Sequence, residues 1–303
     1  MHPLLTAFIP GLAALASVFA LIAGVTLWQK RVKKRNRRSP LTQKMLRPPG
    51  ESLRIQIVDL DFENNFMVVM LIVMPFIMFA IHVSQSYFGE YPESLIRVGG
   101  SVVIALVAGF IMLRKITTAL DKRRRLVLGL EGELATGEEL NQLMLSGCRV
   151  YHDVPTDYGN IDHVVVSNSG VFSVETKMVG KLNDGGTCKI TVDHNSDTVK
   201  FGDLNWKIPT QQLDTNSNWL SKHLTKAVGR PIEVESMLAL PGYFIEQRIG
   251  RSNVFVFNPK DPKRFFVHKR KTHTPEQVQQ IAHQIEQLCR NVEPSFGYKK
   301  EWD

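Results

Sequence analysis

The sequence predicts a mixed α/β domain at residues 127–303, preceded by three transmembrane helices. Three observations lead to this fold class. Three long stretches in the first part of the chain carry no Lys, Arg, Asp or Glu. Basic residues gather beside these stretches rather than in the C-terminal part. The C-terminal part alternates β-rich runs with segments of helical periodicity, which is typical of a sheet flanked by helices.

The uncharged stretches have the lengths of membrane spans. Residues 3–28 would extend about 37 Å as a helix, beyond the ~30 Å hydrocarbon core. Residues 65–89 are interrupted only by Pro75. Residues 98–113 are shorter, but Leu95 and Ile96 lengthen them and Arg97 can snorkel. A cleaved signal peptide would need its positive charge before the first apolar run, whereas here the charge follows it.

The charge distribution orients these spans. Residues 29–54 hold ten Lys or Arg and one acid, and residues 114–125 hold six against one. From residue 126 onward there are 20 Lys or Arg and 22 Asp or Glu, so charge gives the domain no support for DNA binding. By the positive-inside rule we expect residues 30–38 and 122–125 in the cytoplasm, residues 84–94 outside, and an external N-terminus.

The expected organisation therefore has five parts. It comprises a first transmembrane helix (1–29), a basic cytoplasmic connector (30–64), two transmembrane helices with a short external loop (65–114), a basic juxtamembrane segment (115–126) and the globular domain (127–303). Cys148, Cys188 and Cys289 form no CxxC pattern, which argues against structural zinc and fits free thiols in a reducing compartment.

Within the domain, periodicity and turn residues predict alternating elements. A Thr274-Pro275-Glu276-Gln277 capping box opens the last helix. The expected helices are residues 131–145, 209–228 and the segment from 275; the expected strands are residues 149–154, 164–166, 171–174, 188–192, 198–201, 235–240 and 253–257.

The hairpin around residues 164–174 carries the first candidate site. If its turn centres on Asn168 and Ser169, then Asp162 faces Glu175, and Lys177 lies on the same face. Two opposed carboxylates repel unless a cation or proton lies between them, which suggests a divalent metal. Two alternatives stay open: an ordinary surface pair of acids, or a register shifted by one residue that separates them.

Several short motifs then occur in a fixed order. They are Gly129-x-x-Gly132-Glu133, Ile161-Asp162-His163-Val164, Gly170-Val171-Phe172, Glu175-x-Lys177 and Pro209-x-x-Gln212. This order resembles the NERD (nuclease-related) domain, a branch of the PD-(D/E)xK nuclease superfamily with the restriction-endonuclease-like fold. The resemblance covers about residues 127–225. One departure is Ile208, where the family usually has Asn before the helix-opening proline.

The resemblance implies a role for each candidate site residue. Asp162 and Glu175 would bind Mg²⁺ or Mn²⁺, joined by the backbone carbonyl of Thr176. Lys177 would orient or activate the attacking water, and Glu133 would be the additional acid. Gln212 would brace Lys177 or a phosphate from the first turn of its helix.

Each role has an alternative. Glu133 could simply stabilise a helix end, and Gln211 could replace Gln212. His163 is expected to pack behind the sheet. Asp153, Asp157 and Asp184 are expected to be loop acids, although one could approach the metal. The glycines serve the backbone rather than a ligand. Candidate phosphate contacts are Lys181, Lys189, Lys200 and Lys207.

The resulting hypothesis is a membrane-anchored, Mg²⁺-dependent nuclease at the cytoplasmic face of a bacterial inner membrane. DNA is a more suitable substrate than RNA, and a homodimer is possible. The alternative from another class is a catalytically inactive nucleic-acid-binding or scaffolding module tethered to the bilayer. An accessory to a transporter is a third option, but the apolar segments contain few polar groups.

Overall fold

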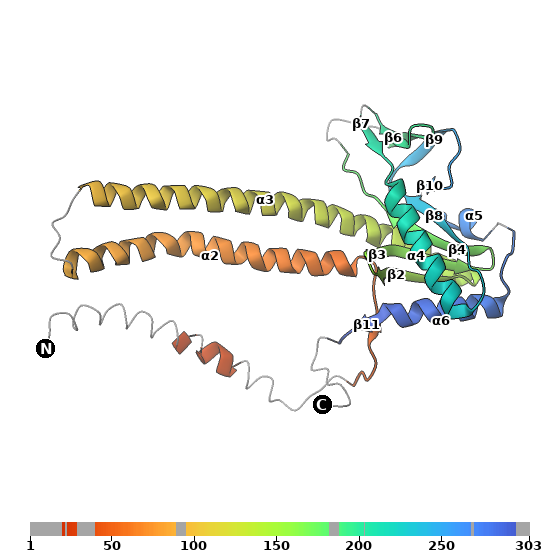
Figure 1. Ribbon diagram of the computed structural model, residues 1–303, viewed down its shortest axis with the longest axis horizontal. Coiled ribbons are helices and arrows are strands. Elements are labelled where there is room, and N and C mark those ends of the chain that lie inside the picture. The colour runs from red at the N-terminus through yellow and green to blue at the C-terminus, as the bar shows by residue number, and fades with distance from the viewer. Residues whose placement is uncertain are drawn as a thin grey trace. The chain divides into compact units, whose positions relative to one another are not determined.

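The computed structural model describes residues 20–21, 23–28, 40–88, 95–181, 188–202, 204–267 and 270–294 (Figure 1). The chain divides into two compact units. One comprises Met1–Thr42, Val58–Arg123 and Ser295–Asp303, and the other comprises Gln43–Ile57 and Arg124–Pro294.

The first unit is dominated by parts of two long helices, α2 (Glu51–Phe88) and α3 (Leu95–Asn141). Residues of α2 at alternating spacings of three and four are buried or half-buried, as in an antiparallel helix pair: Ile57, Leu60, Asn64, Met67, Leu71 and Met74. A Cβ on Gly109 of α3 would lie 3.9 Å from Leu71, so the helices are in contact there. Their other faces expose large apolar side chains, including Phe62, Phe76 and Phe110.

The helices differ from the expected boundaries. Helix α2 begins at Glu51, inside the segment expected as a connector, because no proline or glycine interrupts residues 51–65. Helix α3 joins the third apolar segment, the basic segment and residues 131–141 of the expected helix 131–145 without a break, and the remaining residues form a 3₁₀ helix. Lys and Arg, which are frequent in the basic segment, are good helix formers, so the helix continues through it. The first apolar segment lies mostly outside the described residues.

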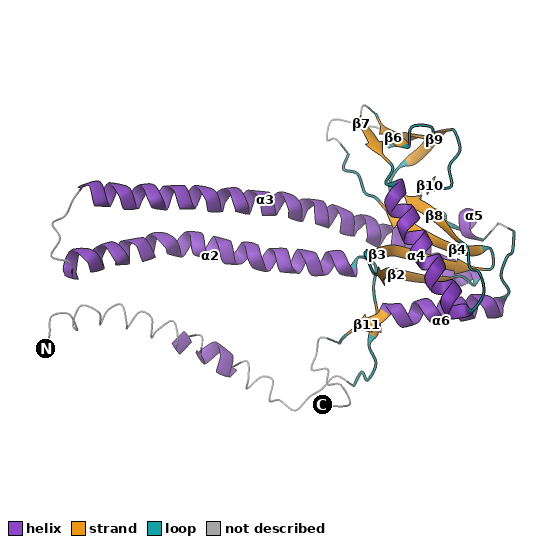
Figure 2. Ribbon diagram, viewed as in Figure 1, coloured by secondary structure: helices purple, strands orange, loops and turns teal. Residues whose placement is uncertain are grey.

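The second unit is built on a mixed five-stranded sheet (Figure 2). Its order is β10 (Phe255–Phe257), β8 (Val234–Ala239), β4 (Gly170–Thr176), β3 (Gly159–Ser167) and β2 (Arg149–Thr156). Strand β8 runs parallel to both β10 and β4, while β3 runs antiparallel to β4 and β2. The predicted mixed α/β core is confirmed.

Helices cover both faces of this sheet. On one face, α4 (Thr210–Val228) and α6 (Pro275–Cys289) pack with a core that includes Leu220, Ile281 and Val164. On the other, the end of α3, the 3₁₀ helix η1 (Gln142–Ser146) and α5 (Lys263–Phe266) cover Phe172 and Val165. The expected stripe of α4, Leu213, Leu220 and Leu224, is buried. The capping box of α6 is present, with Thr274 as its N-cap.

Two smaller sheets complete this unit. One has the order β7 (Leu204–Lys207), β6 (Thr198–Phe201), β5 (Lys189–Asp193) and β9 (Phe244–Ile249). Its β5–β6 hairpin was predicted, whereas β7 and β9 were not. The other pairs β1 (Met45–Leu46) with β11 (Arg290–Val292), which ties the segment before α2 to the end of α6.

Candidate active site

The β3–β4 hairpin has the register that the turn predicts. Val166 pairs with Val171 and His163 with Val174, so one further step along the same register sets Asp162 opposite Glu175. Both carboxylates are buried, with exposed fractions of 6% and 2%. The backbone N–H of Thr176 donates to Asp162 Oδ2 at 2.7 Å, which fixes that side chain beside the end of β4.

Glu175 is the best-connected acid of the cluster. Its Oε1 accepts from Lys177 Nζ at 2.6 Å and from Gln212 Nε2 at 2.7 Å. Its Oε2 accepts from Asn216 Nδ2 at 3.4 Å. Gln212 thus contacts the acid rather than Lys177, and Gln211 is exposed one position earlier on the helix. Asn216 was missed, although it lies four residues after Gln212 and so on the same face of α4.

Lys177 follows directly after strand β4. Its backbone N–H bonds the carbonyl of Ala239, which attaches it to the neighbouring strand β8. Burial alone would lower the pKa of its amine, but the adjacent Glu175 carboxylate outweighs this and the net shift is upward. The amine is therefore an ammonium at neutral pH, with 35% of its side chain exposed.

Glu133 reaches the same cluster from helix α3. It is 6% exposed, and its Oε2 is buried without a hydrogen-bond partner among the described residues. The backbone of Gly50 hydrogen-bonds the carboxyl group. Burial, and then the charges of Asp153 and Glu175, raise the pKa of Glu133 to about 7. A helix-end role alone does not account for this placement, because Glu133 lies within α3 and beside the other acids.

A glycine brings Glu133 close. A Cβ on Gly132 would lie 2.7 Å from the Cβ of Met178, the residue after Lys177. Only a residue without a side chain lets α3 approach the end of β4 this closely. Gly132 is thus a packing device, as expected.

The three acids repel one another. Burial, followed by the charges of Glu175 and Glu133, raises the pKa of Asp162 well above its usual value. Lys177 is the one cation that lowers the pKa of both Asp162 and Glu133 among the causes resolved. Hard oxygen donors and an unpartnered buried carboxylate oxygen are the chemistry that Mg²⁺ or Mn²⁺ requires. Among the described residues, however, no three His, Cys, Asp or Glu side chains already form a complete metal-ligand group.

A hydrated magnesium ion does not need such a complete group of protein ligands. Mg²⁺ usually keeps several waters and takes only one or two protein carboxylates. Asp162 and Glu175 would provide that minimum, so the donor set fits a hydrated ion rather than a closed protein cage.

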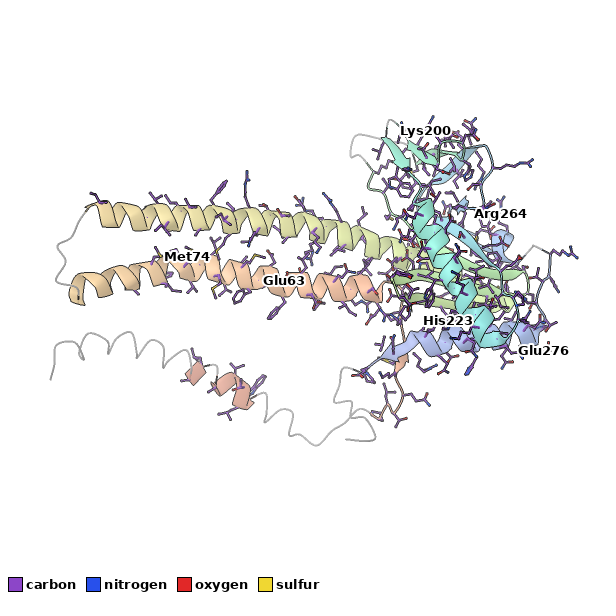
Figure 3. The ribbon with its side chains drawn as sticks, in the orientation of Figure 1. Glu63, Met74, Lys200, His223, Arg264 and Glu276 are labelled. Carbon is purple, nitrogen blue, oxygen red and sulfur yellow. The ribbon has the colours of Figure 1, made fainter. Side chains whose placement is uncertain are left out.

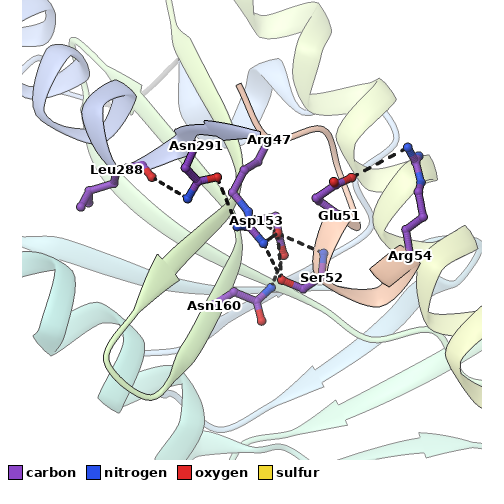
Figure 4. Close-up of polar contacts among 8 residues, drawn as sticks. All are labelled: Arg47, Glu51, Ser52, Arg54, Asp153, Asn160, Leu288 and Asn291. Atoms are coloured by element: carbon purple, nitrogen blue, oxygen red, sulfur yellow. Dashed lines mark hydrogen bonds and ion pairs between the residues drawn. The ribbon is translucent and has the colours of Figure 1, made fainter. Parts of the chain in front are cut away.

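Asp153 proved different from the loop acid that was expected. It lies within β2, fully buried, in the left-handed backbone region (φ 49°). Figure 4 shows its carboxylate bound by Arg47, by the backbone and hydroxyl of Ser52 (3.1 and 2.9 Å) and by Asn160 (2.6 Å). Arg47 and Ser52 belong to the segment before and at the start of α2. An isolated acid in the middle of an apolar strand was the signal, since it needs a cation from elsewhere.

The other polar candidates lie apart from the cluster. His163 packs on the opposite side of β3 from Asp162, as predicted, with its Nδ1 2.8 Å from His152 Nδ1. Asp157 accepts from Trp219 Nε1 at 2.8 Å. Asp184 lies outside the described residues. Burial lowers the pKa of both histidines, that of His152 to about 4, so both rings are neutral.

Comparison with known proteins agrees with the motif order. No curated protein and no solved structure matches the chain. One family does match, over residues 128–241, a range that includes Glu133, Asp162, Glu175, Lys177 and Gln212 but not Arg47 or Gly50. That family is described as NERD, nuclease-related domain, and the chain therefore carries a nuclease-related domain at residues 128–241.

Proposed function

We propose that this protein is a membrane-anchored, metal-dependent nuclease that hydrolyses DNA phosphodiester bonds at the cytoplasmic face of a bacterial inner membrane. The observation that carries the proposal is the buried cluster around Glu175. Inside a nuclease-related domain, one carboxylate is held by Lys177 and Gln212 while Asp162 and Glu133 lie within electrostatic reach. Clustered acids that faced a phosphate without a cation would oppose binding.

The metal would be held by Asp162 and Glu175, with the backbone carbonyl of Thr176 as a further donor. When bound, Mg²⁺ or Mn²⁺ lowers the pKa of water and offsets phosphate charge. The amide groups of Gln212 and Asn216 keep Glu175 in one orientation, and the N–H of Thr176 does the same for Asp162. These contacts leave few rotamers to the two ligands, which reduces the cost of assembling the site.

Lys177 and Glu133 have different protonation behaviour and so different roles. The ammonium of Lys177 has a raised pKa, so it donates hydrogen bonds and stabilises negative charge on the phosphate rather than accepting a proton. Glu133, with a pKa of about 7, exchanges a proton near neutral pH. We assign to Glu133 the acceptance of a proton from the attacking water.

A basic surface on the smaller sheet supports nucleic acid as the substrate. Lys200 pairs with Thr191, and Lys207 pairs with Thr198, so the register sets both lysines on one face of that sheet. Lys189, two residues before Thr191, follows on the same face, where its Nζ pairs with Glu246 Oε1 at 2.6 Å. Figure 3 shows Lys200 at this sheet. Such lysines would contact the phosphates of any sequence. Lys181 is also exposed.

Two features support the membrane location. Within the described residues, Glu51–Met78 and Val102–Ser146 are long and apolar enough to cross a bilayer. Only 6% of the apolar stretch in each is buried in the protein, unlike the core helix of a soluble protein. The exposed apolar side chains, such as Phe66, Ile72 and Ile104, would contact lipid.

The test is cleavage of a plasmid by the purified full chain in a mild detergent, with Mg²⁺ or Mn²⁺ and with EDTA. We expect metal-dependent cleavage that falls about 10²–10⁴-fold in Glu133→Gln and at least as much in Glu175→Gln and Lys177→Met. Glu138→Gln, exposed on the same helix as Glu133, and Lys222→Met, exposed on α4, are matched controls that should retain activity. Cleavage indifferent to these site substitutions would refute the assignment. Tight DNA binding without cleavage would favour the non-catalytic module.

A further inference from the structure

A cleft lies between α2 and α3 within the helical unit. It has a volume of about 370 Å³. Helix α2 contributes Leu60 and Met67, and helix α3 contributes Arg114, Lys115, Thr118, Ala119 and Lys122. Three of the seven lining residues are cations and none is an acid.

The cleft lies where both helices change from charged to apolar. Glu63 is the last charged residue in α2, and from residue 98 Arg114 is the first in α3. Figure 3 shows Glu63 and, farther along α2, Met74 in the apolar part. Two contacts bracket the level of the cleft: Arg123 with Asp61 on the charged side, and Gly109 with Leu71 on the apolar side.

The lining combines the two parts of a lipid headgroup site. Leu60, Met67 and Ala119 form the apolar wall of the cleft, and Arg114, Lys115 and Lys122 supply its charges. The nearby acid Asp61 is occupied by Arg123, whose Nε lies 2.6 Å from Oδ1. The guanidinium of Arg114 lies over the Phe110 ring, 5.1 Å from its centroid, one turn toward the apolar part of α3. That contact uses the face of the guanidinium and leaves its edge able to bind an anion.

We propose that this cleft binds the headgroup of an anionic phospholipid, with Arg114, Lys115 and Lys122 around the phosphate and the apolar wall against the glycerol and upper acyl chains. The inference rests on the proposed membrane location. Basic pockets between membrane helices suit such headgroups because the charged interface meets hydrocarbon there. A nucleic-acid backbone would use the cations but gain nothing from the apolar wall, so lipid is the better occupant.

The experiment measures lipid retained by the full chain purified in a mild detergent, by native mass spectrometry with added phosphatidylglycerol or phosphatidylcholine. The cleft variant is Lys115→Gln/Lys122→Gln. The matched control is Arg124→Gln/Arg125→Gln, which removes the same charge from the same helix outside the cleft. Each interfacial cation contributes about a fivefold factor in affinity for anionic lipid, so the cleft variant should bind phosphatidylglycerol roughly 25-fold more weakly. The control should change less than about threefold.

Several outcomes would overturn the proposal. These are equal retention of phosphatidylcholine, equal losses in the two variants, displacement of the lipid by millimolar inorganic phosphate, or its displacement by duplex DNA. Carbonate extraction of native membranes distinguishes failure of the proposed membrane location from failure of the headgroup site. Release of the protein would refute the membrane location itself, whereas an integral protein without lipid preference would refute the headgroup site alone.

Discussion

At the scale of single residues, the candidate site is a place where local stability is lower than it could be. Asp162, Glu175 and Glu133 are buried together, and among the described residues Lys177 is the cation that lowers the pKa of both Asp162 and Glu133. A fold selected for stability alone would replace one acid by a neutral residue of the same shape. The burial of all three together argues for a use in binding or chemistry.

The first prediction separates these two demands. Asp162→Asn keeps the oxygen that accepts from the N–H of Thr176 but removes one buried charge. We expect the free energy of unfolding to rise by about 1–2 kcal/mol in EDTA, while nuclease activity falls at least about 100-fold. Asp214→Asn, exposed on α4, should change stability by less than about 0.5 kcal/mol. Thermal denaturation in detergent provides the measurement, and a clear loss of stability in Asp162→Asn would contradict the account.

The second prediction concerns the pH dependence due to Glu133. Its pKa is about 7 in the folded protein against a usual value of 4.5. Between these values the folded protein holds a proton that the unfolded chain has released, so the stabilisation from this group falls as the pH rises and is lost above pH 7. The free energy of unfolding of the wild type minus that of Glu133→Gln should therefore fall by about 2 kcal/mol from pH 5 to pH 8. A constant value would show that the pKa of Glu133 is unshifted, and a rising value would show that it is lowered; either result would contradict the account.

At the scale of elements, the segment before α2 is part of the folded domain. Asp153 is fully buried, and its cation Arg47 comes from that segment. The same segment pairs through β1 with β11, and its Gly50 contacts Glu133. Arg47 and Gly50, which lie outside the family match, thus contact Asp153 and Glu133 inside it.

The third prediction compares Arg47 of this segment with Arg54 of the first turn of α2. Arg47→Met leaves the Asp153 carboxylate buried without its cation and should cost about 3–5 kcal/mol of stability. Arg54→Met removes an exposed partner 3.9 Å from Glu51 and should cost less than about 1 kcal/mol. Asp153→Asn combined with Arg47→Met should recover part of the loss, because no charge then remains buried. Chemical denaturation measures the stability of all three variants. Equal losses for Arg47→Met and Arg54→Met would refute a stabilising role for the buried Arg47–Asp153 ion pair.

The sequence predicted those elements whose patterns are local. The capping box of α6 and the apolar stripe of α4 appear where expected, and the turn at Asn168 and Ser169 set the register that brings Asp162 and Glu175 together. What it could not predict depends on distant partners. Asp153 read as a loop acid because Arg47 is 106 residues away in sequence. The short edge strands β7 and β9 have no pattern of their own and are defined by their pairing with β6 and β5.

At the scale of the whole molecule, the helical unit and the nuclease-related unit differ in how much apolar surface they expose. Only 6% of the apolar stretch in each of the two long helices is buried, whereas the sheet unit has three buried clusters of its own. The fourth prediction follows from this contrast. The full chain should remain in the membrane pellet after alkaline carbonate extraction, and a C-terminal tag should be digested by protease in inside-out vesicles but not in intact spheroplasts. Solubility without detergent would contradict it.

The buried histidine pair behind the sheet has a consequence for how proton positions are fixed in this domain. Asn141 Oδ1 lies 3.0 Å from Nε2 of His152, so that nitrogen carries the proton and Nδ1 of the same ring is a bare acceptor. His163 must then donate from its own Nδ1, which leaves its Nε2 bare; that atom indeed has no partner in the described structure. The two rings are locked in opposite tautomers, in a one-way relay that ends at the last residue of α3. Nitrogen-15 spectra of the imidazoles should therefore show one ring of each form, unchanged until acid breaks the relay.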